Sequence, residues 1–290
     1  MDYKELLART EKLEEENPLL SFGYLGTSLL GRGIPMLTLG RGRLEVLYVG
    51  THHALEWLTS DLLLRFLEEA KDPGTRRVSG VSIAELFECV KFYVVPMLNP
   101  DGVEYVFHGI SDDNPIKERV LAMNGGSKTF SSWQANGRGV DLNHNYNDCF
   151  SEYQAASGIQ SGAPTRFAGE EPESEPEVAY LCGFLRHHPK IRGVLSFHTQ
   201  GEVIYYQSRG VMLPSSLRIA KRMEAVSGYR LERAEGLSSY GGLTDWCLRT
   251  MKIPAFTIEC GRGENPLPKS ELKKIYSDLR TLLYLFPTWL

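Results

Sequence analysis

The chain has 290 residues, of which 42% are hydrophobic and 23% are charged, as is usual for a soluble globular protein. Its formal net charge is −4 and it has no block of lysine and arginine, so we expect neither nucleic acid nor an anionic membrane surface as a partner. No apolar run approaches the ~20 residues of a membrane span. A chain of this length can bury a core without metal cross-links, so any bound metal is expected to be catalytic.

The N-terminal part is predicted to form a helix followed by strands. Residues 1–18 have the pattern of an amphipathic helix that ends before Pro18. Three extended runs follow, at 20–25, 35–39 and 44–49. Because Gly/Arg turns separate the later runs, we expect an antiparallel hairpin series. The next segments are predicted to be two helices and a strand buried on both faces, at 55–70, 81–90 and 92–98.

The second half begins with a loop-rich stretch at 101–169, which its length marks as functional. Ser174 and Glu177 then predict a capping box for a helix that runs to residue 188. The remaining segments are a strand with its expected hairpin partner, then helices alternating with short strands, at 193–198, 202–207, 215–228, 229–235, 242–251, 255–260 and 269–286. Alternating strands and helices predict an α/β fold with a mixed sheet, in a single domain that spans residues 1–290.

The cysteines favour a reducing compartment. They are odd in number and widely spaced, with no C-x-x-C pair, so we expect reduced thiols and no disulfide framework. The five are Cys89, Cys149, Cys182, Cys247 and Cys260. The N-terminal segment is charged and has no apolar core of a signal peptide. We therefore expect a cytoplasmic protein.

Three residues are candidate ligands of a catalytic zinc ion. His53 and Glu56 lie three residues apart where a strand leads into a helix, which lets both side chains point to one centre. His198 ends a buried strand, and the ends of strands are where α/β proteins build sites. Catalytic zinc typically takes three such ligands and leaves a fourth position for water. The spacing of His52 makes it a neighbour of this group rather than a ligand.

Glu259 is the candidate general base. It lies near the end of a strand that is too apolar to hold an unpaired carboxylate without compensation. A zinc-activated water gives such compensation, and a carboxylate within hydrogen-bond reach can accept its proton. The four residues together predict a zinc-dependent peptidase.

Six motifs occur in the order that is typical of one family. They are H-x-x-E-W at 53–57, N-P-D-G at 99–102, G-V-D-L-N at 139–143, His198, G-G-x-x-D-W at 241–246 and Glu259. On these motifs the chain resembles the zinc carboxypeptidase (metallocarboxypeptidase) family over about residues 50–268. The resemblance implies a mixed eight-stranded sheet sandwiched by helices and one Zn²⁺ ion per chain.

The resemblance also implies roles for individual residues. His53, Glu56 and His198 fall on the metal ligands, and Glu259 falls on the general base. The remaining matches are a carboxylate that orients a ligand histidine, a substrate-binding asparagine and a cation for the developing oxyanion. These are Asp141, Asn143 and Arg138.

Three positions depart from the pattern of the digestive members. His144 stands where those enzymes have an arginine that clamps the C-terminal carboxylate of the substrate, and histidine is a poorer, pH-dependent clamp. Tyr240 immediately precedes Gly241, whereas the family's mobile tyrosine lies several residues earlier. Thr244, at the side-chain pocket, is neither acidic nor apolar, which suits a polar, zwitterionic substrate side chain.

Segments around residues 133–143, 197–202 and 257–268 are similar to a bacterial branch, the γ-D-glutamyl-meso-diaminopimelate peptidases of peptidoglycan stem peptides. Arg262, Arg166 and His144 are the candidate partners of the diaminopimelate carboxylate. Because the motifs begin at His53, we expect no cell-wall-binding repeats ahead of them, and we expect a muropeptide or short peptide from inside the cell as the substrate.

Two alternative functions have different signatures. The first is a metallocarboxypeptidase or amidase of different specificity, which activity on ordinary C-terminal substrates would reveal. The second is a non-catalytic binding protein, which predicts the loss of a ligand or of Glu259. All four positions are intact, which argues against the second. The sequence predicts no particular oligomeric state.

Overall fold

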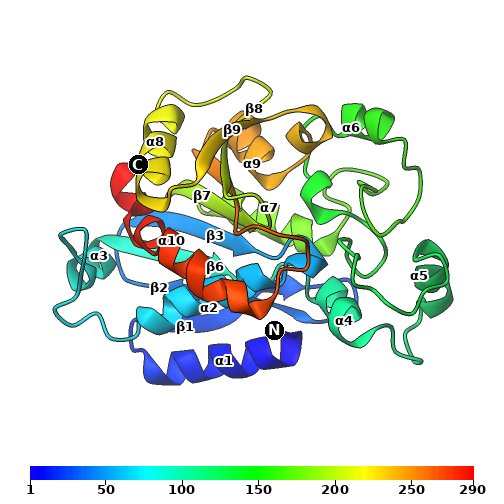
Figure 1. Ribbon diagram of the computed structural model, residues 1–290, viewed down its shortest axis with the longest axis horizontal. Helices are drawn as coiled ribbons and strands as arrows, with labels where there is room; N and C mark the ends of the chain where they lie inside the picture. Colours follow the sequence, from blue (N-terminus) through cyan, green and yellow to red (C-terminus); the bar gives the residue numbers. More distant parts are fainter.

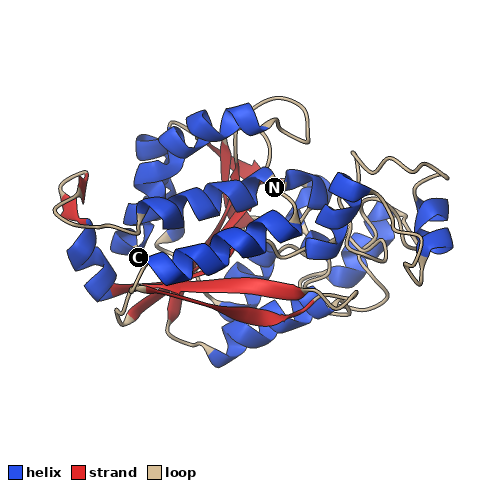
Figure 2. Cartoon of the chain, turned by 90° about the horizontal axis from the view of Figure 1, so that it is seen from below, coloured by secondary structure: helices blue, strands red, loops and turns tan.

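An eight-stranded mixed sheet forms the centre of the protein, in the strand order β1-β2-β6-β3-β7-β10-β8-β9. The computed structural model describes all 290 residues, and helices lie on both faces of the sheet (Figure 2). The predicted α/β fold is therefore confirmed. The strands are β1 (Leu20–Thr27), β2 (Gly33–Leu39), β3 (Leu44–Gly50), β6 (Val90–Val95), β7 (Ile191–His198), β8 (Val203–Ser208), β9 (Arg230–Ala234) and β10 (Ala255–Glu259), and a separate small pair is β4 (Arg77–Val78) and β5 (Val81–Ser82).

The helices form two layers with different cores. Side chains of α1, α2, α3, α8 and α10 belong to the larger buried cluster on one face, and those of α7 and α9 belong to the smaller cluster on the other (Figure 1). None of the helices combines the length and the apolar character that crossing a membrane requires. The helices are α1 (Tyr3–Glu16), α2 (Leu58–Glu69), α3 (Ile83–Cys89), α4 (Pro100–His108), α5 (Lys117–Met123), α6 (Phe150–Ser157), α7 (Pro176–His187), α8 (Ser216–Ser227), α9 (Leu243–Trp246) and α10 (Leu272–Leu285).

The four central strands β6, β3, β7 and β10 run parallel to one another. Their carboxyl ends therefore share one edge of the sheet, where α/β proteins place their sites. The register sets Gly50 of β3 beside Phe197 of β7, and His198 of β7 beside Glu259 of β10. Residues more than two hundred positions apart in the chain are brought together in this way.

The predicted hairpins are only partly present. β1 and β2 form an antiparallel pair, but β6 lies between β2 and β3. Likewise β10 lies between β7 and β8, which were expected to pair directly. In both places a strand from later in the chain fills the gap. Turn residues between two strands therefore did not establish that the strands are neighbours.

The loop-rich stretch at 101–169 contains three helices, α4, α5 and α6, so its description as loop is corrected. The first of them begins at the N-P-D-G motif. Asn99 caps α4 by accepting from the backbone N–H of Gly102 at 3.0 Å, with Pro100 in the first turn. The glycine-rich composition had hidden this short helix.

The predicted capping box at the start of α7 is also absent. Glu175 is the N-cap residue, and the Ser174 hydroxyl donates to the Glu175 carboxylate. The Glu177 carboxylate instead accepts from the backbone N–H of Leu29 at 3.1 Å, in the turn between β1 and β2. The other predicted elements are present within a few residues of their expected bounds, although the segment at 242–251 divides into α9 and one π-helical turn at Cys247–Met251.

Candidate metal centre and active site

The candidate site lies at the carboxyl ends of three adjacent parallel strands. β3 leads into the corner that carries His53 and Glu56, β7 ends at His198, and β10 ends at Glu259. The sheet thus supplies a rigid edge, and each chemically important side chain is placed at or just after the end of a strand.

The corner after β3 is held by side-chain hydrogen bonds. Thr59 Oγ1 donates to the carbonyl oxygen of Glu56 at 2.9 Å, and Asn99 Nδ2 donates to the carbonyl oxygen of His52 at 3.0 Å. These bonds hold the 3₁₀ turn Ala54–Glu56 against the start of α4. The N-P-D-G motif therefore supports the corner as well as opening a helix.

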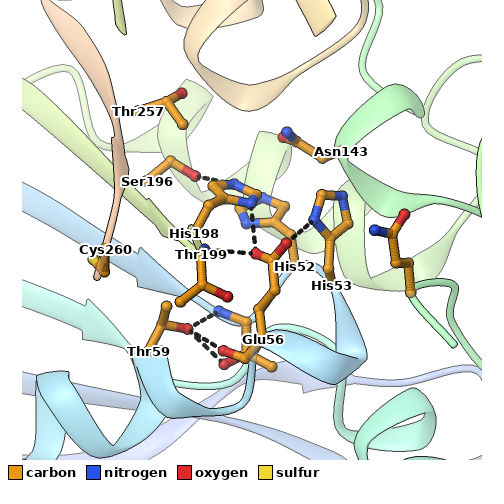
Figure 3. A network of polar contacts seen from close by, with 12 residues as sticks. His52, His53, Glu56, Thr59, Asn143, Ser196, His198, Thr199, Thr257 and Cys260 are labelled. Atoms are coloured by element: carbon orange, nitrogen blue, oxygen red, sulfur yellow. Dashed lines mark hydrogen bonds and ion pairs between the residues drawn. The ribbon is translucent and has the colours of Figure 1, made fainter. Parts of the chain in front are cut away.

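Glu56 lies between two imidazole rings (Figure 3). Nδ1 of His53 is 2.9 Å from Glu56 Oε1, and Nδ1 of His198 is 3.0 Å from Glu56 Oε2. One ligand atom of each residue lies within 4.8 Å of the others. The structure thus brings together the three side chains that were predicted to bind a metal.

The far nitrogen of each ring has a partner of its own. His53 Nε2 is 3.2 Å from Asp141 Oδ1, and His198 Nε2 is 3.1 Å from Ser196 Oγ. Such partners fix the ring orientation of a metal-binding histidine and make the facing nitrogen a better ligand. Asp141 has the position predicted for it, whereas Ser196 was not anticipated.

The charges of the cluster reinforce one another. Burial disfavours the ionised form of Glu56, but His53 and His198 outweigh this and lower the pKa of its carboxyl. Burial likewise opposes the charged form of His53, but the carboxylates of Glu56 and Asp141 raise the pKa of its ring. Without a metal ion, the positive charge that balances the carboxylates of Glu56 and Asp141 is therefore that of the His53 ring.

His52 lies behind the cluster rather than in it. Its Nε2 is 2.8 Å from the hydroxyl of Tyr146, and burial lowers the pKa of its ring well below the usual range. The ring stacks on His198, with centroids 5.3 Å apart. His52 thus packs against the candidate ligand His198, and its own ring remains neutral.

A polar cavity of about 120 Å³ opens beside the cluster, which is room for one side chain. His53, His198 and Glu259 line one part of it, and only two of its thirteen lining residues are hydrophobic. Burial and the nearby charge of Glu56 raise the pKa of the Glu259 carboxyl. Glu259 therefore lies where the metal cluster meets the cavity.

Three of the predicted substrate-binding residues line this cavity, namely Asn143, His144 and Thr244. Thr244 Oγ1 shares a hydrogen bond of 2.7 Å with Thr257 Oγ1. The cavity also exposes polar residues that sequence reasoning missed: Tyr205, Gln207, Ser238, Asp245 and Thr257. They come from β8, β10, α9 and the turn at Gly236–Ser239, and only the G-G-x-x-D-W motif gave a signal for any of them.

Of the residues predicted to contact the substrate, four do not line the cavity. Arg138 forms an ion pair of 2.7 Å with Glu175, so the role predicted for it on the oxyanion would require this pair to break. Arg262 is 68% exposed and is paired with Glu202 at 2.7 Å.

The other two lie nearby but face elsewhere. The side chain of Arg166 is exposed, and only its backbone N–H reaches the site, by donating to Asp141 Oδ2 at 3.0 Å. The ring of Tyr240 packs against the guanidinium of Arg209, 4.6 Å away, and its carbonyl oxygen accepts from His144 Nδ1. The backbone of these two residues, rather than their side chains, shapes the site.

Comparison with known proteins identifies the family to which the chain belongs. The model of one family, described as zinc carboxypeptidase, matches residues 6–281. The chain belongs to this family. It is therefore a zinc metallopeptidase, and the resemblance found in its six motifs is confirmed.

Individual zinc carboxypeptidase relatives agree with this assignment. The chain is 34% identical to gamma-D-glutamyl-L-diamino acid endopeptidase 1 of Lysinibacillus sphaericus over 96% of its own length and 69% of the relative. It is 25% identical to carboxypeptidase B of Bos taurus over 94% of its length and 66% of that enzyme. The solved structure of bovine thrombin-activatable fibrinolysis inhibitor in complex with tick carboxypeptidase inhibitor shares the fold, with a TM-score of 0.74 and 19% identity over 99% of this chain and 96% of that one.

The residues present fit the zinc ion that the family implies. Two imidazole nitrogens and a carboxylate are the donor set of many catalytic zinc sites. A tetrahedral zinc ion with ligands at about 2.1 Å separates its ligand atoms by roughly 3.4 Å, and the two Nδ1 atoms already lie 2.9 and 3.0 Å from the carboxylate oxygens. Only small adjustments of His53, Glu56 and His198 would be needed.

Proposed function

We propose that this zinc peptidase hydrolyses the γ-D-glutamyl–meso-diaminopimelate bond of peptidoglycan stem peptides, with Glu259 as general base. The observation that carries the proposal is the composition of the cavity beside the metal cluster. Its hydroxyls, amides and carboxylates suit a substrate side chain with an amine and a carboxylate at its end. The similarity to an endopeptidase whose name specifies a γ-D-glutamyl-diamino acid bond supports the same substrate class.

The cavity disfavours the side chains that digestive carboxypeptidases release. An aromatic side chain would bury its apolar surface against polar groups that it cannot pair, which costs free energy. A lysine side chain could pair with Asp245, but it has no carboxylate to accept from the hydroxyls of Thr244 and Thr257. A zwitterionic end can pair its ammonium with the carboxylate of Asp245 and its carboxylate with the hydroxyls of Thr244 and Thr257.

In this mechanism, zinc bound by His53, Glu56 and His198 would supply a Lewis acid for the scissile carbonyl and for water. Glu259 accepts a proton from the attacking water and passes it to the departing nitrogen of diaminopimelate. Asp141 holds the ring of His53 in the orientation that keeps its Nδ1 facing the cluster. The cavity binds the side chain on the leaving side and so sets the distance between Glu259 and the scissile bond.

The proposal is tested by comparing two substrate classes. L-Ala-γ-D-Glu-meso-diaminopimelate stems and N-acylated dipeptides with a C-terminal phenylalanine or lysine would be assayed under the same conditions for kcat/KM. We expect the stems to be cleaved at least about a hundredfold faster, the discrimination available when buried polar groups go unpaired. Equal or faster cleavage of the ordinary dipeptides would identify a carboxypeptidase of different specificity instead.

A further inference from the structure

The cavity contains carboxylates but no lysine or arginine. Asp245 and Glu259 line it, and two arginines predicted to contact the substrate, Arg138 and Arg262, are paired with acids outside it. A free α-carboxylate of a substrate bound beside Asn143 and His144 would therefore find no guanidinium or ammonium partner at these two residues. Its burial would be unfavourable unless a neutral group took its place.

The hydrogen bond to Tyr240 fixes which nitrogen of His144 carries the proton. His144 Nδ1 is 2.7 Å from the carbonyl oxygen of Tyr240, which can only accept, so Nδ1 donates. The ring also stacks on Tyr153, with centroids 3.9 Å apart. Nε2 of the neutral ring is then an acceptor, and no group of the protein bonds to it.

The groups that face His144 keep its ring neutral. Burial lowers the pKa of the imidazole, and the rings of His53 and His198 act in the same direction. Asp141 and the Tyr240 carbonyl act in the opposite direction but do not reverse the shift. His144 therefore presents a lone pair to the cavity rather than a positive charge.

Asn143 presents the opposite polarity beside it. Its Oδ1 accepts from the backbone N–H of Leu243 at 3.3 Å, at the first turn of α9, which orients the amide. The two N–H bonds of Nδ2 have no partner in the protein, and Asn143 lies beside the histidine cluster at the cavity wall (Figure 3). The cavity thus offers one donor group and one acceptor on consecutive residues.

A donor and an acceptor side by side complement an amide group, whereas a carboxylate offers only acceptors. We propose that Asn143 and His144 recognise an amide at the α-carboxyl position of diaminopimelate, so that the enzyme prefers stems in which this carboxyl is linked to a further residue. The carbonyl oxygen accepts from Asn143 Nδ2, and the amide N–H donates to His144 Nε2. This inference rests on the proposed function and specifies the length of the substrate.

Three peptides with the same scissile bond test the inference. They are L-Ala-γ-D-Glu-meso-diaminopimelate, its α-carboxamide, and the tetrapeptide with a C-terminal D-Ala. We expect kcat/KM at pH 7.5 to be at least about tenfold higher for the carboxamide and the tetrapeptide than for the free acid, the value of one buried polar mismatch. A free acid cleaved as fast as its carboxamide would overturn the inference and leave the proposed function standing. Cleavage of none of the three at this bond would remove both.

Variants at one position separate recognition from folding. His144→Phe keeps the aromatic stacking on Tyr153 and removes Nε2, so the ratio of amide to free-acid kcat/KM should fall to about one. His144→Arg supplies a cation and should reverse the preference toward the free acid. Thermal melting identifies a variant that has unfolded. If His144→Phe keeps the wild-type ratio of amide to free-acid kcat/KM, the assignment of amide recognition to His144 is contradicted.

A matched variant tests the competing cation. The side chain of Arg166 is exposed and has no ion pair, and its backbone N–H reaches Asp141 beside the site, so Arg166 is the predicted carboxylate partner that remains to be tested. Arg166→Gln should leave the ratio of amide to free-acid cleavage as it is in the wild type. A selective loss of free-acid cleavage in this variant would assign the α-carboxylate to Arg166 and overturn the inference.

Discussion

Glu56 connects the two halves of the candidate metal site, because each of its carboxylate oxygens faces the Nδ1 atom of a different histidine. One of these histidines follows β3 and the other ends β7, so the carboxylate joins two strands that are neighbours in space. Its Oε2 also accepts from the backbone N–H of Thr199 at 3.2 Å. The geometry of the cluster is therefore fixed by the protein before any ion binds.

Glu259→Gln tests the assignment of the general base. The amide is nearly the same size as the carboxylate but cannot accept a proton from water. We expect kcat to fall by about 10²–10⁴-fold, the usual contribution of a general base, while the zinc content stays at one ion per chain. Zinc content would be measured by atomic emission alongside the kinetics. A variant that retains near wild-type kcat would show that another group takes the proton.

Asp245 is predicted to bind the side-chain amine of diaminopimelate. Burial raises the pKa of this carboxyl to about 6, so it is ionised at neutral pH and protonated as the pH falls through that value. Asp245→Asn preserves the acceptor that the backbone N–H of Gly242 uses. We expect KM for a diaminopimelate stem to rise about tenfold, equivalent to about 1.4 kcal/mol.

The control for Asp245 is a stem that contains 2-aminopimelate, which lacks the side-chain amine. Its KM should be the same for wild type and Asp245→Asn. In the wild type, the advantage of diaminopimelate over 2-aminopimelate should be present above pH 6 and lost below it. An advantage that persists at pH 5, or that survives in the variant, would assign the amine to another group.

At the scale of single residues, motif spacing predicted the grouping of the metal-ligand side chains but not the ion-pair partners of the arginines. His53, Glu56 and His198 are placed by the backbone at strand ends, so motif spacing was enough to bring them together. Arg138 and Arg262 reach several ångströms from their backbone to acids elsewhere in the chain. Which acid a flexible arginine meets depends on the tertiary fold, and a motif does not contain that information.

The glycines before α9 position the cavity wall. Gly241 has φ of +71°, and a Cβ there would lie 2.8 Å from the carbonyl oxygen of His144. Gly241→Ala should therefore displace the backbone that carries Asn143 and His144. We expect kcat/KM to fall by at least about tenfold with zinc content unchanged, because a shift near 1 Å costs up to about a hundredfold.

Gly236→Ala is the matched control for this variant. Gly236 also has a positive φ, +59°, but nothing lies within 4 Å of a Cβ built there. Both variants carry the backbone strain of a left-handed alanine, about 1–2 kcal/mol, and only Gly241→Ala adds the collision. Similar kinetic losses in the two variants would attribute the effect to strain rather than to the contact with His144.

At the scale of elements, prediction succeeded for each helix and strand that has a strong pattern and failed for their pairing. The buried strands and the amphipathic α8 and α10 are where the sequence placed them. The insertion of β6 beside β2 and of β10 beside β8 depends on contacts between distant segments. Hairpin signals are local, and they report a turn without reporting which strand becomes the neighbour.

At the scale of the whole molecule, a buried acid is predicted to make stability depend on pH. Glu177 lies in the contact between α7 and the β1–β2 turn, and burial, with the charges of Asp101 and Glu175, raises its pKa to about 8. An acid with a raised pKa favours folding while it is protonated. The contribution of Glu177 to the free energy of unfolding is complete below the ordinary pKa of 4.5 and is lost as the pH rises through about 8.

Glu177→Gln should remove this dependence. Near pH 5 the variant and the wild type should unfold at similar temperatures, and near pH 9 the variant should be more stable by a few kcal/mol, since one pKa unit corresponds to about 1.4 kcal/mol. Urea unfolding at the two pH values measures the difference. Parallel pH profiles for the two proteins would show that Glu177 is already ionised in the folded state.

The fold as a whole was predictable because the six motifs occur in family order and mark the strand ends of the site. The cavity was less predictable, since Tyr205 and Gln207 reach it through the sheet register and Asp245 reaches it from α9. Under the proposed function these residues contact the substrate, so the sequence predicts the metal chemistry more directly than the substrate.

The proposed function requires zinc held by His53, Glu56 and His198 for hydrolysis of the γ-D-glutamyl–diaminopimelate bond. The most direct measurement is a digest of the L-Ala-γ-D-Glu-meso-diaminopimelate-D-Ala tetrapeptide by chelator-treated and by zinc-reconstituted protein, with products identified by mass. We expect L-Ala-D-Glu and diaminopimelate-D-Ala as products, formed only after zinc is restored. Cleavage that persists in the chelator-treated protein, or release of D-Ala alone, would contradict it.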